Sequence, residues 1–215
     1  MLAASTKSLR WVTLGLLALV MSGLAGCGVN NIPTYEEAAK ASWSEVLNQY
    51  KRRTDLVPNL VETVKGYAQQ EEKVLREVVE ARAKATQMQV PADIVNNPEA
   101  MQKFIDNQSQ LGGALARLLV ITENYPELKS NQNFLQLQSQ LEGVENRVAI
   151  ARRDYIETVR VYNTEIKTIP GRWWRSLMYP ESKEMASFTI PEADQAAPKV
   201  DFGTGTSSGG TTTNN

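Results

Sequence analysis

One cysteine and no histidine limit the chemistry that this chain of 215 residues can perform. Without histidine there is no Ser–His or Cys–His nucleophile, no HExxH zinc site and no imidazole for general acid–base catalysis. The sequence also lacks a glycine-rich phosphate loop and an EF-hand pattern of carboxylates. Catalysis would have to rely on carboxylates, lysine, tyrosine or a Ser–Lys pair. We therefore expect a protein that is not an enzyme, with no cofactor and no resident metal ion.

The single cysteine, Cys27, ends an N-terminal region with the layout of a secretory signal peptide. Residues 1–10 carry two basic residues and no acidic one, residues 11–21 are almost wholly apolar, and small residues dominate 22–26. The apolar run is short for a spanning helix, which needs about 20 residues. The sequence Leu24-Ala25-Gly26-Cys27 resembles the bacterial lipobox, in which cleavage before the cysteine accompanies acylation of its sulfur and amine.

An ordinary cleaved signal and an uncleaved anchor are the alternatives. Leu24 would occupy the −3 position of a cleavage after Gly26, where a small residue is preferred. We therefore predict a lipoprotein signal peptide over residues 1–26 and lipidation, palmitate included, at Cys27. Two or three acyl chains hold a protein durably, whereas one is marginal. The protein would then be anchored by lipid to the cell membrane or the outer membrane, on the extracytoplasmic (periplasmic) side.

The charge balance argues against nucleic acid as a partner. Removing Lys7 and Arg10 with the leader from the 23 basic residues leaves 21 against 24 acidic residues, a formal charge of −3. Such a chain has neither the basic surface that binds nucleic acid nor a polybasic patch for anionic lipid. The expected partners are the membrane, through the lipid anchor, and another envelope protein.

Apolar residues at alternating steps of four and three predict long amphipathic helices with a heptad-like, coiled-coil pattern. The first stripe runs from residue 34 to residue 85 and keeps its phase across Pro58. Either a new helix begins at Asp55, which places Pro58 in a first turn, or one helix continues with a kink. The unbroken phase favours a kinked or coaxial rod over a reversal, and such a rod would be about 75–80 Å long.

Two further helices complete the predicted fold. Asn97-Pro98-Glu99 supplies a cap, a proline at the first position and an acid, so a second helix is predicted over 98–123. Gly112 and Gly113 within it are expected to let a neighbouring helix approach closely, with a ligand-binding role as the alternative. A third helix is predicted from about residue 131 to residue 169. The fold class is therefore all-α, an elongated antiparallel bundle of long helices.

These patterns divide the chain into five segments. They are the signal peptide (1–26), a lipidated N-terminus and spacer (27–34), the helical bundle (35–170), a C-terminal extension (171–202) and a disordered tail (203–215) rich in glycine, serine and threonine.

The extension begins with a pair of tryptophans, Trp173 and Trp174, between Arg172 and Arg175. Aromatic residues flanked by arginine can lie at a membrane interface, and the alternative is that they cap the bundle. A third helix antiparallel to the second and parallel to the first would place the pair far from the lipid anchor. We therefore expect the tryptophans to pack on the bundle or to meet a partner, unless the rod lies flat on the membrane.

Residues 51–67, KRRTDLVPNLVETVKGY, resemble the signature of the LemA family of bacterial envelope proteins. The resemblance covers roughly residues 35–202, and it implies a long antiparallel helical bundle in a membrane-associated protein. It also implies no established catalytic activity, and relatives are associated with membrane proteases or membrane-organelle formation. Typical members have an N-terminal spanning helix where this sequence has a lipobox. Further matching motifs follow in order at 79–85, 112–118, 125–129, 133–138, 145–153, 162–164 and 197–202.

The motif residues fall into an apolar set and a polar set. The apolar set is predicted to be core: Leu56, Leu60, Val64, Leu115, Phe134 and Leu137. Packing alone does not require these particular residue types at the positions of the polar set. These residues form either buried latches between helices or a partner-binding surface. Its members are Arg52, Arg53, Asp55, Asn59, Glu62, Lys65, Arg82, Arg117, Arg147, Arg152 and Arg153.

Three hypotheses of function follow from these patterns. The leading one is a lipid-anchored, extracytoplasmic envelope protein that acts as a non-catalytic interaction or scaffold module and presents a helical rod to another envelope protein. The second is an envelope protein that binds a small ligand or a metal ion through the region of Asp55, Glu62 and Glu80. The third is an enzyme that works without histidine.

Overall fold

The computed structural model describes residue 15 and residues 28–188. The predicted tail, Cys27 and all of the predicted signal peptide except Gly15 lie outside these residues. The described residues contain no strand, so the all-α prediction is confirmed. The long helices are α2 (Asn31–Lys65), α3 (Glu72–Gln87), α4 (Pro98–Thr122) and α6 (Gln132–Lys167), and the short elements are η1 (Gln69–Glu71), η2 (Ile94–Asn96), α5 (Pro126–Lys129) and α7 (Gly171–Met178).

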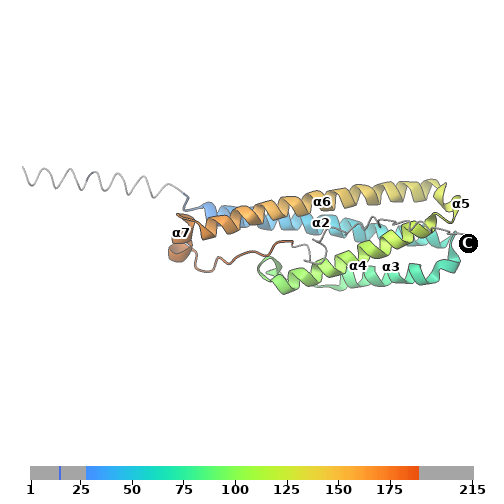
Figure 1. Cartoon of the computed structure of the whole chain (residues 1–215), viewed down its shortest axis with the longest axis horizontal. Helices are drawn as coiled ribbons and strands as arrows, with labels where there is room; N and C mark the ends of the chain where they lie inside the picture. Colours follow the sequence, from blue (N-terminus) through green and yellow to red (C-terminus); the bar gives the residue numbers. More distant parts are fainter. Residues whose placement is uncertain (1–14, 16–27, 189–215) are drawn as a thin grey trace, which may run out of the picture.

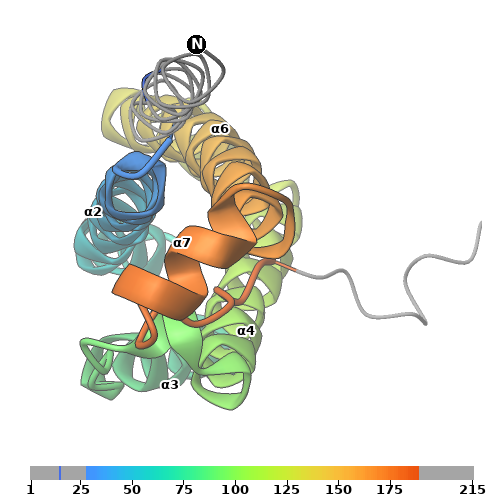
Figure 2. The same cartoon turned by 90° about the vertical axis from the view of Figure 1, so that its left-hand side faces the viewer.

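The four long helices form an elongated bundle in which successive helices run antiparallel (Figures 1 and 2). α2 packs along α6, α3 packs against α4, and α2 also contacts α3. Asn31 Nδ2 on α2 donates to Glu165 Oε1 on α6 at 3.2 Å, and Arg53 Nη1 donates to Glu145 Oε1 at 3.1 Å. The residue number falls on α6 as it rises on α2, so these two helices are antiparallel.

The first helical stripe contains a reversal, so the expected rod over residues 34–85 is wrong. α2 ends at Lys65, and the chain turns back through residues 66–71 into α3. At the turn Ala68 is fully buried, and its N–H donates to the Val64 carbonyl at 2.9 Å. The stripe keeps its phase because the buried faces of α2 and α3 line the same core, and periodicity does not report the direction of a helix.

Two other expectations about the first helix are settled. Pro58 lies inside α2, as the kinked-helix alternative predicted. α2 alone is about 52 Å long at 1.5 Å per residue. It begins at Asn31, within the segment that was predicted to be a spacer.

The reversal also overturns the expected position of the tryptophans. α3 runs back along α2, so the next long helices, α4 and α6, each have the direction opposite to the one expected. α6 is therefore antiparallel to α2, and α7 lies at the end where α2 begins (Figure 1). Trp173 and Trp174 therefore lie at the same end of the bundle as Gly28, not at the far end. Trp174 packs partly buried against the core, whereas Trp173 is 62% exposed.

The remaining long helices begin where the sequence predicts. Asn97 caps α4, and its Oδ1 accepts the N–H of Ala100 at 3.1 Å. Asn131 caps α6, and its Oδ1 accepts the N–H groups of Asn133 and Phe134 at 2.9 and 3.1 Å. These caps satisfy backbone donors that have no partner within the helix.

The glycine pair of α4 does not bring a neighbouring backbone close, so that expectation is wrong. A Cβ at Gly112 would meet Nη1 of Arg53 at 3.7 Å, and a Cβ at Gly113 would meet Nη1 of Arg117 at 3.9 Å. These are ordinary van der Waals distances to the ends of side chains. A methyl group would therefore fit at either position, and these contacts do not explain why the two residues are glycines.

Two hydrophobic clusters fill the bundle. The α7-side cluster joins the start of α2 to the end of α6 and includes Trp43, Tyr50, Phe104 and Tyr155. The ring of Trp43 lies edge-to-face with Phe104 and is tilted against Tyr155, with centroid distances of 5.3 and 5.2 Å. The α5-side cluster joins the remainder of α2 to α3, α4, α5 and the start of α6. Of the predicted core, Leu60, Val64, Leu115 and Phe134 are buried, and Leu56 and Leu137 are half-buried at the edges of the clusters.

Residues 182–188, here called the strap, complete the α7-side cluster. Tyr155 Oη donates to the carbonyl of Ala186 at 2.7 Å, and Tyr162 Oη donates to the carbonyl of Lys183 at 3.0 Å. Met185 and Phe188 are 3% and 8% exposed. The first part of the predicted C-terminal extension therefore belongs to the core.

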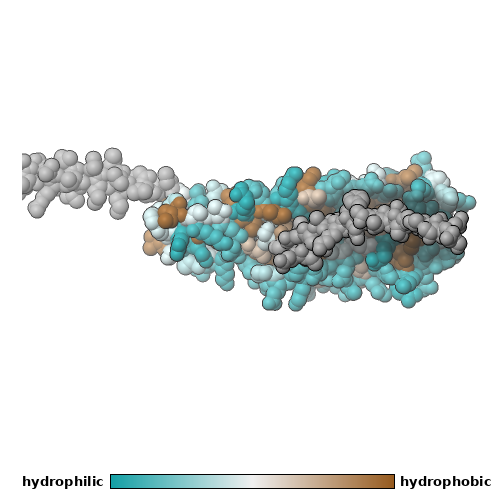
Figure 3. Space-filling view, in the orientation of Figure 1, coloured by the Kyte–Doolittle hydropathy of each residue, from teal (hydrophilic) through white to brown (hydrophobic). Residues whose placement is uncertain are grey.

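The outer surface is mainly hydrophilic, with small hydrophobic patches that include the α7 end (Figure 3). Among the described residues, no helix combines the length and apolar content needed to cross a bilayer.

We predict that Leu115→Ala will lower the free energy of unfolding by about 2–5 kcal/mol, because it removes buried methyl groups and leaves a cavity. Leu115 is 3% exposed in the α5-side cluster. Urea denaturation measures the change, and Leu135→Ala, at a 48% exposed position of α6, is the matched control. Equal losses in the two variants would contradict the packing described here.

We also predict that stability falls above about pH 10. Burial raises the pKa of Tyr155, Tyr162 and Tyr50 above the ordinary value of 10.0, and for Tyr50 the cations Arg152 and Arg53 oppose the shift. The unfolded chain loses these phenolic protons first, so the stabilisation is complete below pH 10 and declines as the pH rises further. Urea denaturation across this range should show the decline, and Tyr155→Phe should reduce it. A pH dependence that is identical in the variant would contradict the assignment.

Candidate functional site

Arg53 of α2 is a buried cation between the two hydrophobic clusters. Its side chain is 5% exposed. Nη1 donates to Glu145 of α6 at 3.1 Å, and Nη2 donates to both the backbone carbonyl and the side-chain Oε1 of Gln108 on α4, at 2.8 and 2.7 Å. The guanidinium lies 5.0 Å from the ring centroid of Tyr50. One side chain therefore joins α2, α4 and α6 near the middle of the bundle.

Arg82 of α3 fills a gap that Pro58 leaves in α2. In a regular helix the carbonyl of Thr54 would accept the N–H of residue 58, but proline has no N–H. The carbonyl accepts Nε–H of Arg82 instead, at 3.0 Å. The proline of one sequence motif thus frees a carbonyl, that of Thr54, which accepts a hydrogen bond from the arginine of another motif and links α2 to α3.

These contacts define a polar layer that crosses all four long helices. Its members are Arg53, Thr54, Arg82, Gln108 and Glu145. Buried polar groups are costly unless they are hydrogen-bonded, so the layer favours the register in which both Nη atoms of Arg53 find acceptors, although its Nε is buried without a partner.

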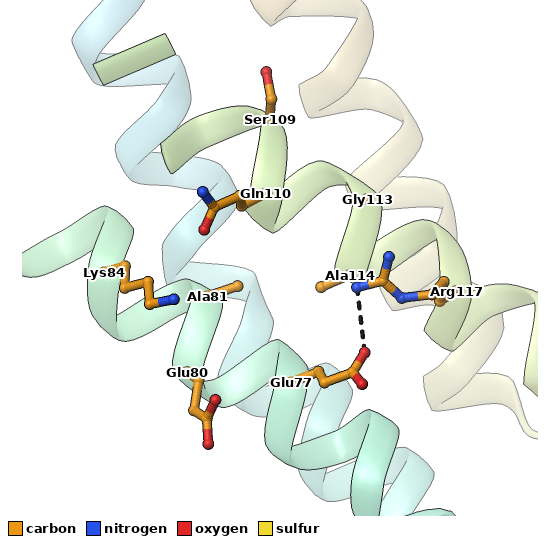
Figure 4. Close-up of a pocket in the computed structure, with 9 residues that line it drawn as sticks. All are labelled: Glu77, Glu80, Ala81, Lys84, Ser109, Gln110, Gly113, Ala114 and Arg117. Atoms are coloured by element: carbon orange, nitrogen blue, oxygen red, sulfur yellow. Dashed lines mark ion pairs between the residues drawn. The ribbon is translucent and has the colours of Figure 1, made fainter. Parts of the chain in front are cut away.

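Two other predicted arginines make contacts between separate segments. Arg117 of α4 forms an ion pair of 3.2 Å with Glu77 of α3, across an open groove of about 470 Å³ (Figure 4). Arg152 of α6 lies over the ring of Phe188 in the strap, 4.7 Å from its centroid. The Arg117 pair is exposed to solvent, and such pairs contribute about 0–1 kcal/mol. Arg53, Arg82, Arg117 and Arg152 thus each contact another segment of the fold, and of the four only Arg53 is buried.

A second group of motif residues faces solvent. Arg52, Asp55, Asn59 and Glu62 are exposed and follow one another at steps of three and four, so they lie on one face of α2. We call this face the α2 stripe. Asp55 pairs with Lys51 on the same helix at 3.2 Å. The stripe continues the signature that supplies Arg53, but on an exposed side of α2, where Asp55 and Glu62 border hollows toward α3.

The other predicted polar residues are also exposed. Lys65 ends α2, and Arg147 and Arg153 lie on α6. Arg153 is 3.6 Å from Asp154, its neighbour in sequence. Packing in the described part of the chain does not explain the identity of these three side chains.

The structure does not assemble the suggested ligand or metal site. Glu80 lines the groove between α3 and α4, Glu62 lines a separate groove of about 560 Å³ between α2 and α3, and Asp55 lines a third hollow beside Phe104 and Gln108. Within the ranges that the structure describes, no three side chains of the metal-binding types come together.

Residues 42–202 match the sequence profile of the LemA family. That range contains the polar layer, the α2 stripe and the strap, and it takes in most of the chain. The chain belongs to the LemA family. The sequence resemblance to this family is therefore confirmed.

Curated relatives of this LemA-family chain include three magnetosome proteins. MamQ 1 and MamQ 2 of Paramagnetospirillum magneticum are each 24% identical to it over 160 residues, and MamQ of Magnetospirillum gryphiswaldense is 26% identical over 156 residues. The alignments span 67% and 65% of this chain. They span 59% and 57% of the relatives, so the chain covers less than two thirds of their length.

Sequence reasoning missed three members of the polar layer, Thr54, Gln108 and Glu145. Gln108 occupies a position of the apolar stripe of α4, and a polar residue at a core position was the available signal. Glu145 opens the motif at 145–153, from which only the arginines were selected. Nothing in the spacing indicated that both would meet Arg53, because their separations from it are 55 and 92 residues.

We predict that Arg53→Met will lower the free energy of unfolding by about 1–3 kcal/mol, because it leaves Oε1 of buried Gln108 without its donor. Glu145 is 43% exposed and can be hydrated when its partner is lost, which limits the cost. The neighbouring exposed residue provides the control: Arg52→Met should change stability by less than about 0.5 kcal/mol. Chemical denaturation measures the free energy of unfolding of both variants. Similar losses in the two would contradict the conclusion that Arg53 links the helices as a buried latch.

Proposed function

We propose that this LemA-family protein is a non-catalytic scaffold that is anchored to a membrane and presents its helical rod to another protein of the cell envelope. The observation that carries the proposal is the α2 stripe. Arg52, Asp55, Asn59 and Glu62 belong to the family signature, yet they are exposed, and among the described residues the structure shows no hydrogen bond or ion pair between them and another helix. A patterned polar face that the fold does not use is available to a partner.

The anchor in this proposal is a lipid on Cys27, on the extracytoplasmic side. The lipobox supports it, and the relatives named as magnetosome proteins support an association with membranes. The stripe begins about 30 Å and ends about 45 Å along α2 from Asn31, at 1.5 Å per residue. A rod held at its α7 end would therefore display the stripe well away from the lipid.

The shape and the charge of the surface grooves also favour a scaffold role over a small-molecule site. The grooves lie open on the surface between helices and have charged rims, such as Glu62, Lys65 and Arg76 beside α3. Small-molecule sites are usually concave and mostly apolar, with a few convergent polar groups. An elongated polar face is better suited to a second protein.

Photo-crosslinking in cells tests the proposal. A benzophenone amino acid in place of Asn59 in the full chain should give a defined adduct with one other envelope protein, whereas the same probe in place of Gln140, exposed on α6, should not. Arg52→Glu combined with Glu62→Lys should abolish the Asn59 adduct and leave the melting temperature unchanged. Equal adducts from both positions, or an adduct that survives the charge reversals, would contradict the proposal.

A further inference from the structure

The end of the bundle that carries α7 exposes an unusual set of apolar side chains. Ile169, Trp173, Leu177 and Met178 are 64%, 62%, 78% and 52% exposed. Ile169, Trp173 and Leu177 follow one another at steps of four, which places Trp173 and Leu177 on one face of α7. We call these four residues the apolar tip. In Figure 2, α7 lies across the end of the bundle.

The opposite side of α7 is fixed to the bundle. Trp174 packs against the α7-side cluster, and Arg175 Nε donates to the carbonyl of Ser182 at 2.8 Å. Gly171 is buried, and a Cβ there would lie 2.1 Å from the carbonyl oxygen of Glu165, so the helix begins in close contact with α6. The apolar tip is therefore held in place before it meets any partner, which limits the entropy lost on binding.

The N-terminal chain reaches the bundle beside this tip. A Cβ at Gly28 would lie 3.8 Å from Oε1 of Glu165, and a Cβ at Gly171 would lie 3.0 Å from the same oxygen. Gly28 and the first residue of α7 therefore flank one carboxylate. Cys27 directly precedes Gly28 in the sequence. The residues before it, 11–26, are almost wholly apolar or small.

We infer that the apolar tip inserts into the surface of the lipid bilayer and forms a second membrane contact beside the N-terminal anchor. The inference rests on the proposed membrane anchor, because the anchor brings lipid to this end of the bundle. Tryptophan favours the interface between headgroups and acyl chains, and an apolar helix face lies in that interface with its polar side outward. A bilayer is the partner that the proposed N-terminal anchor, which joins the bundle at Gly28 beside the tip, brings to this end.

The charges at this end indicate how the tip binds. Arg172 and Lys183 are exposed, but Glu181 and Glu184 are exposed beside them, and Lys167 pairs with Glu184. The local charge is therefore nearly balanced, and insertion depends on apolar contact more than on attraction to anionic lipid. Contact should persist on zwitterionic phosphatidylcholine and should change little with salt. With two attachment points side by side, the rod projects from the membrane and α2 leads away from it.

Quenching of tryptophan fluorescence by lipid tests the inference. The full chain with Trp11→Phe is reconstituted in phosphatidylcholine vesicles with or without brominated acyl chains. Trp43 is buried in the core and Trp174 packs on the bundle, so Trp173 should account for most of the quenching, and the further change Trp173→Phe should remove at least half of it. Leu177→Glu should also reduce quenching at least twofold with unchanged circular dichroism. The matched control is Val120→Glu, at a 70% exposed position of α4, which should have no effect.

The outcomes separate this inference from the proposed anchor. The mass of the N-terminal peptide reports lipidation of Cys27 independently of the tip. A lipidated chain whose quenching is unaffected by Trp173→Phe and Leu177→Glu overturns the tip contact and leaves the anchor standing. Quenching that depends on the tip in a chain without lipid on Cys27 supports the tip contact and refutes the lipid anchor. If the tip variants alter only concentration-dependent self-association, the partner is a second copy of the chain and the inference is wrong.

Discussion

A buried guanidinium in the middle of the bundle determines how the helices fit together. Arg53 reaches Gln108 on α4 and Glu145 on α6 from its place on α2, while the adjacent Thr54 carbonyl receives Arg82 from α3. Replacing such a layer by apolar residues often leaves a fold equally stable, so its value is not simply net stability. A slip of one helix by a turn would, however, separate Arg53 from its acceptors and leave a buried charge unpaired. The layer therefore selects one register for helices whose apolar stripes would tolerate several.

The sequence signature around Arg53 serves two purposes, because its residues lie partly on the buried side of α2 and partly on the exposed side. The buried side supplies Arg53 and the gap at Pro58, and the outer side supplies the α2 stripe. Contacts within the bundle explain the residue types on the buried side. The second set has no such explanation, and for that reason we assign it to a partner. In the proposed arrangement the apolar tip, at the end of the bundle where α2 begins, would contact lipid, and the stripe lies partway along the rod.

Much of the fold could be predicted from the sequence, because amphipathic periodicity and capping residues are local signals. The caps Asn97 and Asn131 and the buried positions of Leu60, Leu115 and Phe134 are examples. The turn at residues 66–71 could not be predicted in the same way. A stripe that keeps its phase is equally compatible with one long helix and with two antiparallel helices on a shared core. That one error also reversed α6 relative to α2 and moved Trp173 to the wrong end.

The candidate site was harder to predict because it depends on contacts between distant segments. Among eleven polar residues of similar chemistry, periodicity alone would have placed Arg53 on the buried side of α2 and Arg52 on the outer side. The partners of Arg53, and the use of Arg82 in place of the missing N–H of Pro58, required the packed bundle.

A double-mutant cycle between Arg53 and Gln108 tests the central claim most directly. Arg53→Met, Gln108→Leu and the combined variant are compared with the native chain by urea denaturation. The account predicts that the two losses are not additive, with a coupling free energy of about 1–3 kcal/mol, because the double variant leaves neither partner unsatisfied. Additive losses, with coupling below about 0.5 kcal/mol, would contradict the claim that this contact holds the helices in register.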